Sequence, residues 1–117
     1  GYLDRGLANP KIVEILNYIN SHLTEPLPID FLAQTFYLSK YHMMRLFRQE
    51  TGYSIHGYLQ ERRLLHAREL IRQGISATES CFRSGFGSYS SFTRAYAKRF
   101  STTPTGRRGA PAEETYE

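Results

Sequence analysis

The sequence repeats itself once, and this repeat constrains the fold more than any other feature. Residues 39–47, SKYHMMRLF, align with residues 88–96, SYSSFTRAY, 49 positions further on. Each segment starts with a serine and carries an apolar residue four positions on, an arginine six on and an aromatic eight on. A short helical pattern and a tight turn precede each segment, at residues 36–38 and 85–87. Short helix, tight turn and second helix are the plan of the helix-turn-helix motif, so the repeat predicts two such units in tandem.

Caps and breaks place the other helices. Asn9-Pro10 can cap and open a first helix, and Pro28 can open a short second helix that runs to about Phe36, with Phe31 and Leu32 directed inward. Ser39 and Ser88 can cap the helices of the two repeated segments, and Ser76-x-x-Glu79 matches the capping box. Sustained apolar/polar alternation is missing, so no strand is expected. Pro104 can start one last turn.

The segment from Ser54 to Gln73 is uninterrupted by proline and, after Gly57, by glycine. A helix of this length measures roughly 30 Å. Successive major grooves on one face of B-DNA are about 34–36 Å apart. The long helix could therefore hold two helix-turn-helix units in adjacent grooves, and a single chain would read an asymmetric site.

Helical spacing also predicts the core. Met43 and Phe47 recur on one side of the first repeated segment, and Phe92 and Tyr96 on one side of the second. The other residues expected to face inward are Ile12, Ile15, Leu16, Ile19, Leu23, Leu46, Tyr58, Leu59, Ala67, Leu70 and Ile71.

Charge is distributed unevenly along the chain. The formal net charge is +4, from 15 basic and 11 acidic residues. Residues 80–112 hold six basic side chains and no acidic one, whereas the first 38 residues hold two basic and four acidic ones. This basic excess indicates a polyanionic partner such as nucleic acid. A basic solvated surface without a partner is the alternative.

Several kinds of site are not expected. The single cysteine excludes an intramolecular disulfide and a cysteine-based zinc site. The four histidines, at positions 22, 42, 56 and 66, do not form a metal-binding pattern, so we expect neither a metal nor another cofactor. No apolar run approaches the ~20 residues needed to span a membrane. The start at Gly1, without an initiator methionine, indicates a piece of a longer protein.

Five groups of residues are characteristic in combination. They are Leu32-Ala33, Leu38-Ser39-x-x-His42-Met43-x-Arg45-Leu46-Phe47, Gly52-x-Ser54-x-x-x-Tyr58, Arg63-Leu64-x-x-Ala67 and Gly85-Phe86-x-Ser88-x-Ser90-x-Phe92-x-Arg94. Together they resemble the DNA-binding domain of AraC/XylS-type transcription regulators, over about residues 9–108. The sequence departs from the family pattern at Ser80-Cys81, where the family has an Ile-Ala pair, at Ser101, where it has a glycine, and at Arg107, where it has an aromatic residue. The resemblance places Cys81 at a core position of the family, so we expect it to be a buried small apolar residue.

The resemblance implies an all-α fold of seven helices that form two tandem helix-turn-helix units joined by a long linker helix. We expect a flank at residues 1–8 and a DNA-binding domain at residues 9–108. Within this domain the first unit covers about 9–52, the linker helix about 54–73 and the second unit about 76–108. The composition of residues 109–117 predicts a disordered tail.

The resemblance also implies a function, which is sequence-specific binding of double-stranded DNA in bacterial transcription regulation. Such domains form the C-terminal part of longer, effector-responsive regulators in the cytoplasm, in association with the nucleoid, and activation is favoured over repression. The implied partners are an asymmetric DNA site that spans two major grooves and RNA polymerase. A small-molecule effector would act only through a missing N-terminal domain, and no membrane is involved.

Two arginines are the sharpest candidates for reading bases. An outward arginine on a recognition helix can donate two hydrogen bonds to guanine O6 and N7. The resemblance implies that the residues at positions facing base edges are Tyr41, Met44, Arg45, Tyr89, Ser90 and Arg94. Those expected to contact the DNA backbone are Ser39, Lys40, Arg48, Ser88, Ser91, Thr93, Lys98 and Arg99. Either arginine could instead pair with a phosphate or a local carboxylate, and the role of Arg63 is left open.

Two other functions were considered. His42 and Arg45 form an H-x-x-R pattern, which tyrosine recombinases use in catalysis, but 117 residues are too few for such a catalytic domain. A helical module that docks onto an acidic protein, without binding DNA, is the other alternative. The chain is therefore expected not to be an enzyme.

Overall fold

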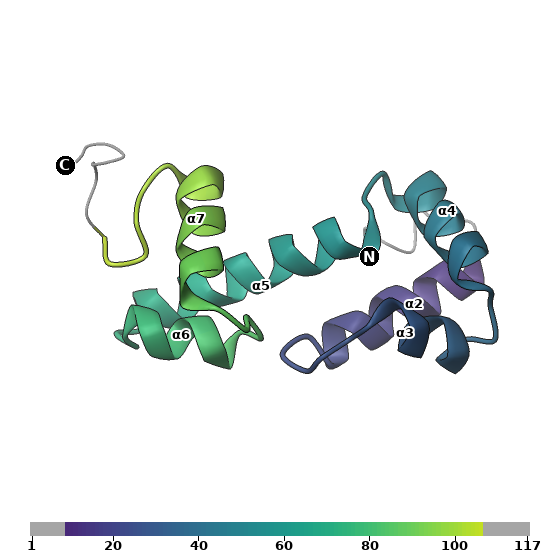
Figure 1. The fold of residues 1–117 in the computed structure, drawn as a ribbon, viewed down its shortest axis with the longest axis horizontal. Helices are drawn as coiled ribbons and strands as arrows, with labels where there is room; N and C mark the ends of the chain where they lie inside the picture. The colour runs from purple at the N-terminus through teal and green to yellow at the C-terminus, as the bar shows by residue number, and fades with distance from the viewer. Residues whose placement is uncertain (1–8, 107–117) are drawn as a thin grey trace. The chain divides into compact units, whose positions relative to one another are not determined.

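The structure is a computed structural model, and it describes residues 9–106 (Figure 1). The described residues contain helices and no strand, which confirms the all-α prediction. The helices are α2 (Pro10–Ser21), α3 (Ile29–Thr35), α4 (Lys40–Thr51), α5 (Ile55–Arg72), α6 (Ala77–Arg83) and α7 (Tyr89–Phe100).

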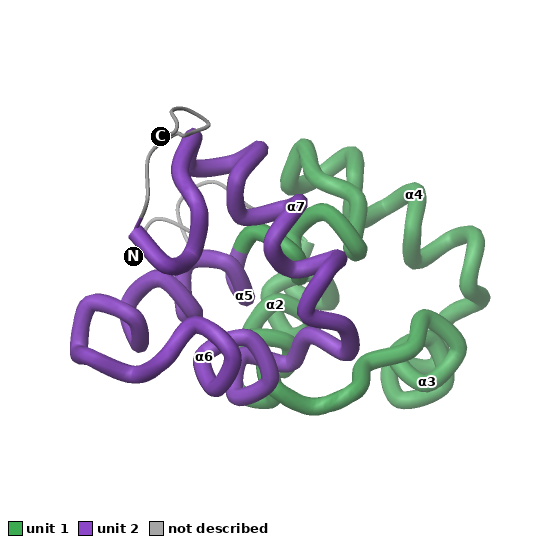
Figure 2. Tube along the Cα trace, turned by 60° about the vertical axis from the view of Figure 1, so that its left-hand side comes forward, with its two compact units in different colours: residues 1–61 green, residues 62–117 purple. Residues whose placement is uncertain are grey.

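The chain divides into two compact units between Glu61 and Arg62, within α5 (Figure 2). In unit 1, helices α3 and α2 both contact α4, and in unit 2 helix α6 contacts α7. Each unit has its own buried cluster, centred on Phe47 in unit 1 and on Phe92 in unit 2. Each repeated segment of the sequence therefore supplies the second helix of a helix-turn-helix unit, α4 in one and α7 in the other.

Helix starts follow the predicted caps. The side chain of Asn9 accepts hydrogen bonds from the backbone N–H groups of Lys11 and Ile12, at 2.9 and 3.3 Å. Ser39 Oγ accepts from the N–H of His42, and Ser88 Oγ from that of Ser91. These bonds satisfy donors that a helix start leaves without an intrahelical partner. Ser76 and Ser54 cap α6 and α5 in the same way.

The repeat extends to the ends of α4 and α7. Gly52 ends α4 with φ +81°, and its N–H donates to the carbonyl of Arg48. Ser101, 49 positions further on, ends α7 with φ +60°, and its N–H donates to the carbonyl of Ala97. Both residues are in the left-handed region, where glycine is free of the steric cost that a side chain incurs. The departure from glycine at Ser101 thus places a strained residue at the end of α7.

Exchanging these two caps is expected to change stability in opposite directions. A left-handed conformation costs a residue with a side chain about 1–2 kcal/mol, part of which the greater freedom of glycine in the unfolded chain offsets. Ser101→Gly should therefore raise the stability of unit 2 by up to about 1 kcal/mol. Gly52→Ala should lower the stability of unit 1, because alanine is strained at this φ even though its Cβ would meet no atom within 4 Å. Urea denaturation followed by circular dichroism checks both, and a lower midpoint for Ser101→Gly would contradict the argument.

One prediction was wrong and another is not confirmed. The described residues hold six helices, so the expected count of seven is not confirmed, and residues 104–106 form a turn, closed by a hydrogen bond from the N–H of Gly106 to the carbonyl of Thr103. Gly106 has φ +85°, which ends helical geometry. Phe31 does not face inward but is 44% exposed, whereas Leu32 is fully buried. A seven-residue helix has a narrow inward face, and Leu32 and Ala33 fill it. The predicted flank and tail lie outside the described residues, as does Arg107.

The buried cluster of unit 2 is smaller and more polar than that of unit 1. Its fully buried residues include Cys81, as predicted. Ser80 and Ser84, which are close to Cys81 in the sequence, are also fully buried. Ser80 Oγ lies 3.5 Å from the carbonyl oxygen of Ile75, and Ser84 Oγ has no hydrogen-bond partner among residues 9–106. A buried hydroxyl without a partner costs about 1–3 kcal/mol. The Ser80-Cys81 departure thus leaves unit 2 with less apolar burial than an Ile-Ala pair would give.

The thiol of Cys81 should be unreactive in the folded protein. Burial raises the pKa of this thiol, so that at pH 8 it stays protonated, and the thiolate is the reactive form. We expect Ellman's reagent to label the native chain far more slowly than the chain in urea. The raised pKa also means that folding stability is unaffected below about pH 8.5, the ordinary cysteine pKa, and falls as the pH rises above it. Equal labelling rates in the two conditions would contradict the burial.

No helix in the part of the chain that the structure describes is both long and apolar enough to cross a membrane.

Candidate nucleic-acid interface

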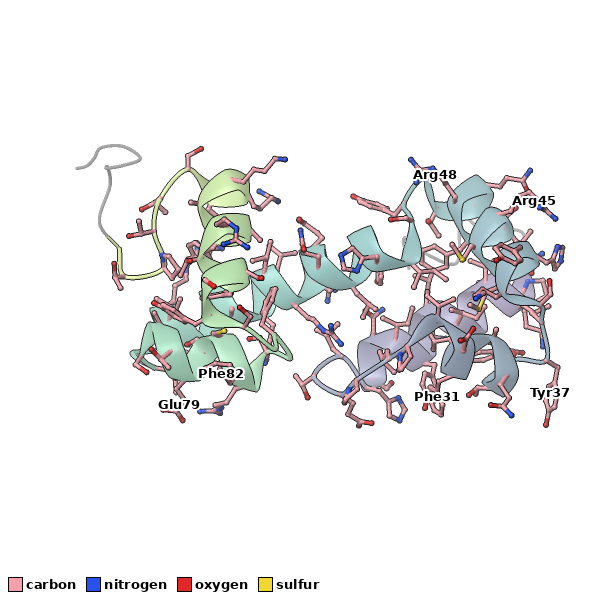
Figure 3. All side chains as sticks on the ribbon, viewed as in Figure 1. Phe31, Tyr37, Arg45, Arg48, Glu79 and Phe82 are labelled. Atoms are coloured by element: carbon pink, nitrogen blue, oxygen red, sulfur yellow. The ribbon has the colours of Figure 1, made fainter. Side chains whose placement is uncertain are left out.

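Helix α4 presents four predicted contact residues on one exposed face. Tyr41, Met44, Arg45 and Arg48 recur at three- and four-residue spacing, which places them on the same side of a helix. The opposite side of α4 carries Met43 and Phe47, both fully buried in the core. We call these four exposed residues the outer face of α4. In Figure 3, Arg45 and Arg48 project on the side of unit 1 opposite to Phe31 and Tyr37.

The arginines of this face are available for an external partner. Arg45 makes no ion pair and no side-chain hydrogen bond within the described residues. Arg45 and Arg48 line a hollow of about 330 Å³ together with Met44 and with Ile55 and His56 at the start of α5. The side chains of Ile29, Met44 and Ile55 give this hollow an apolar lining beside the two arginines. This arrangement suits a planar or methyl-bearing partner that also carries acceptors.

The predicted backbone contacts at the start of α4 already have partners. Ser39 Oγ caps the helix, and Lys40 Nζ lies 3.5 Å from Asp30 Oδ1 on α3 and 5.4 Å from the centre of the Tyr41 ring. Both members of the Lys40–Asp30 pair are solvent-exposed, and such pairs contribute only about 0–1 kcal/mol. Lys40 can therefore exchange Asp30 for a stronger anion at little cost.

Helix α7 presents a corresponding polar face. Ser90, Ser91, Arg94 and Lys98 are exposed, whereas Phe92 and Tyr96 are buried on the opposite side. We call these four exposed residues the outer face of α7. Arg94 Nη2 lies 3.5 Å from Ser91 Oγ, a long contact that holds the guanidinium loosely along the helix. Arg94 occupies the same place in the repeat as Arg45.

Two predicted contact residues of α7 are half-buried instead. Tyr89 is half-buried, and its ring centre lies 5.9 Å from that of Phe92. Thr93 is half-buried and donates to the carbonyl of Ser90. Tyr89 and Thr93 therefore flank the outer face of α7 rather than form it. Arg99 is exposed, and its guanidinium lies 4.9 Å from the centre of the Phe100 ring. Ser88 remains exposed and caps the helix.

Some surface features were not foreseen from the sequence. Tyr37, in the turn between α3 and α4, is 92% exposed with φ +58°. Phe82 on α6 is 50% exposed. Helical periodicity gives no signal for Tyr37, because the residue lies outside any helix. His56 lines the hollow only because α5 packs against α4. Arg63 is partly buried, which lowers the pKa of its guanidinium.

The chemistry that this arrangement offers is recognition. Two outward arginines, several hydroxyl groups and one exposed methionine offer hydrogen-bond donors and an apolar contact. Nowhere in residues 9–106 do three or more His, Cys, Asp or Glu side chains gather as metal ligands would. Two helix-turn-helix units, each with an arginine on the outer face of its second helix, define a class of DNA-binding proteins.

Comparison with known proteins places the chain more narrowly. Residues 32–109 match the family model described as a helix-turn-helix domain. The chain is 33% identical over 101 residues to a probable transcription factor, PqrA, of Proteus vulgaris. The matched region covers 84% of this chain and 83% of PqrA. It spans about a third of the length of several other curated relatives.

Solved structures agree with this placement. A transcriptional regulator of Chromobacterium violaceum, described as AraC-type, is 31% identical with a TM-score of 0.75 and covers 90% of this chain and 95% of its own. The DNA-binding domain of AdpA, solved with a target DNA, is 26% identical with a TM-score of 0.79 and covers 89% and 95%. The chain belongs to the AraC-type family of helix-turn-helix DNA-binding transcription regulators. It is therefore a regulator's domain and not an enzyme.

Proposed function

We propose that the chain binds a specific double-stranded DNA site with the outer faces of α4 and α7 and thereby regulates transcription. The observation that carries the proposal is the equivalent placement of Arg45 and Arg94. Each arginine lies six positions after a serine that caps its helix, and each is exposed opposite a buried aromatic core. An arginine in this position can read guanine through two hydrogen bonds.

The residues divide into two roles in this proposal. Base edges are read by Tyr41, Met44, Arg45, Ser90 and Arg94, with Tyr89 at the margin because its ring is half-buried. The apolar side chain of Met44, 41% exposed, suits a thymine methyl group. The backbone is held by side chains that position the protein without reading sequence, and these are Ser39, Lys40, Arg48, Ser88, Ser91, Thr93, Lys98 and Arg99.

In this proposal both units bind one asymmetric DNA site, in adjacent major grooves. The length of α5 supports the proposal, because its 18 residues run without interruption and measure about 27 Å, close to the spacing of successive major grooves. The AdpA DNA-binding domain, which has the same fold, was solved in complex with a target DNA. Two readers in one chain make dimerisation unnecessary for reading two grooves, and the chain alone is expected to be a monomer.

The cellular role is proposed by analogy with the family. The matched region covers only about a third of the length of several relatives, which agrees with a C-terminal DNA-binding domain of a longer, effector-responsive regulator in the bacterial cytoplasm. Activation through contact with RNA polymerase is the favoured mode. A small-molecule effector of such a regulator would act through the N-terminal domain.

Selection from a random duplex library tests this function. We expect enriched sequences at about 150 mM salt, since phosphate contacts alone give strong unspecific binding at lower ionic strength. The expected motif is bipartite and non-palindromic, with two blocks about ten base pairs apart. A single short block would show that only one unit reads sequence. The absence of any enriched sequence would overturn the proposal and favour a module that docks onto an acidic protein.

A further inference from the structure

Unit 2 contains a hollow that the proposed DNA interface does not use. Its volume is about 650 Å³, within the range of ~300–1,000 Å³ that is usual for small-ligand sites. The last turns of α5, the second half of α7 and residues 101–106, which turn back from the end of α7 (Figure 1), line it. We call it the α5–α7 pocket and define it by Arg68, Ile71, Arg72, Tyr96, Phe100 and Ser101.

Two guanidinium groups make this pocket electropositive. Arg68 lies over the ring of Phe100, 4.3 Å from its centre, and forms no ion pair with a carboxylate of the described residues. Arg72 has one acidic neighbour, Glu69, at 3.9 Å, and more than half of each side chain of this pair is in solvent. The cation–π contact with Phe100 holds the Arg68 guanidinium in the pocket, where its N–H groups can donate to a ligand.

The hydroxyl group of Tyr96 adds a neutral donor to the two cations. Burial raises the pKa of this phenol, and the charges of Arg68 and Arg72 partly counteract the rise. The hydroxyl is therefore protonated at neutral pH and lies within electrostatic reach of both arginines. Side chains of Ile71 and Phe100 provide apolar surface in the same hollow.

We propose that the α5–α7 pocket binds a small organic anion, in which a carboxylate or phosphate group is attached to an apolar body. Arg68 and Arg72 hold the anionic group, because guanidinium groups bind such anions with charge-assisted hydrogen bonds. The apolar body packs against Phe100 and Ile71. This site lies beyond the proposed DNA-binding function and would allow unit 2 to respond to a ligand directly.

The position of the pocket on α7 explains how such a ligand would act. Tyr96 and Phe100 belong to the side of α7 that carries the core residue Phe92, whereas Arg94 lies on the outer face. Binding therefore leaves the proposed DNA-reading side free. A ligand that contacts both α5 and α7 stabilises the folded form of unit 2, whose own buried cluster is small.

Titration of the full chain with phenyl phosphate, followed by two-dimensional amide NMR at constant ionic strength, tests the proposal. We expect saturable shifts of the Ile71 and Ser101 signals and tighter binding of phenyl phosphate than of inorganic phosphate. Arg68→Gln and Arg72→Gln should each weaken binding about tenfold, the value for loss of one charge-assisted hydrogen bond. Glu69→Gln should strengthen binding, because it removes the competing carboxylate from Arg72.

Arg62→Gln is the matched control, because Arg62 is an exposed arginine of α5 outside the pocket. The affinity of this variant for phenyl phosphate should equal that of the parent chain. Arg72 is 65% exposed, so its replacement tests the pocket even where Arg68→Gln, which loses the contact with Phe100, does not fold. Shifts that do not saturate, or an equal loss in the Arg62 variant, would overturn the proposal. Loss of phenyl phosphate binding in the presence of the selected duplex would overturn it too, since the arginines would then be clamps for the DNA backbone.

Discussion

Replacing Arg45 by alanine is expected to weaken binding to the selected duplex by about 1–3 kcal/mol, or roughly 5- to 150-fold in Kd. The reason is that Arg45 is exposed on the outer face of α4 and makes no ion pair within the described residues, so its donors are free to reach a base. The loss should be confined to sequences that carry the preferred base pair at one position of the first block. Fluorescence anisotropy with the selected duplex and with its single-base variants measures both effects.

The equivalent change at Arg94 should relax the second block in the same way. Arg62→Ala, on α5, removes one positive charge without touching either outer face and is the control for a general loss of charge. Lys98→Ala removes a proposed phosphate contact, so it should weaken binding about equally for all sequences and reduce the salt dependence. If Arg45→Ala weakened all duplexes equally, the base-reading role of Arg45 would be refuted.

Replacing Phe92 by alanine is expected to destabilise unit 2 by about 3–5 kcal/mol. The Phe92 side chain is fully buried, and its ring centre lies 5.0 Å from that of Phe86 and 5.5 Å from that of Tyr96. The alanine leaves a cavity in a cluster with few other apolar residues. Because small domains are stable by only about 5–15 kcal/mol, we expect much of unit 2 to unfold near 37 °C.

Labelling of Cys81 reports on this unfolding, because the thiol is buried in the same cluster as Phe92. The Phe92→Ala chain should react with Ellman's reagent far faster than the parent, while amide NMR signals of unit 1 keep their positions. Phe82→Ala is the matched control, because Phe82 is 50% exposed and its loss should change stability by less than about 0.5 kcal/mol. Equal destabilisation by the two alanine variants would show that the cluster around Phe92 is not the core of unit 2.

The caps and the repeat could be predicted because they depend on local chemistry. A serine or asparagine that accepts hydrogen bonds two or three residues ahead is visible in the sequence, and Asn9, Ser39, Ser76 and Ser88 all act this way. The apolar stripe of α2 could be predicted for the same reason, since its spacing matches the helical period.

The remaining features depend on tertiary packing. Phe31 is exposed because Leu32 and Ala33 already fill the inward face of α3, and only the placement of α2 and α4 decides between these neighbours. The half-buried ring of Tyr89 depends on Phe92 in the same way. The α5–α7 pocket joins residues about thirty positions apart in the chain, and their spacing carries no motif.

The most direct test of two readers in one chain is the affinity for a duplex whose two selected blocks are moved apart by five base pairs. This insertion is about half a helical turn, so it puts the blocks on opposite faces of the DNA. If α4 and α7 read one site together, the affinity should fall to that of a duplex with a single block, and Arg94→Ala should then have no further effect. An affinity equal to that of the uninterrupted site would contradict the proposed joint reading by the two units.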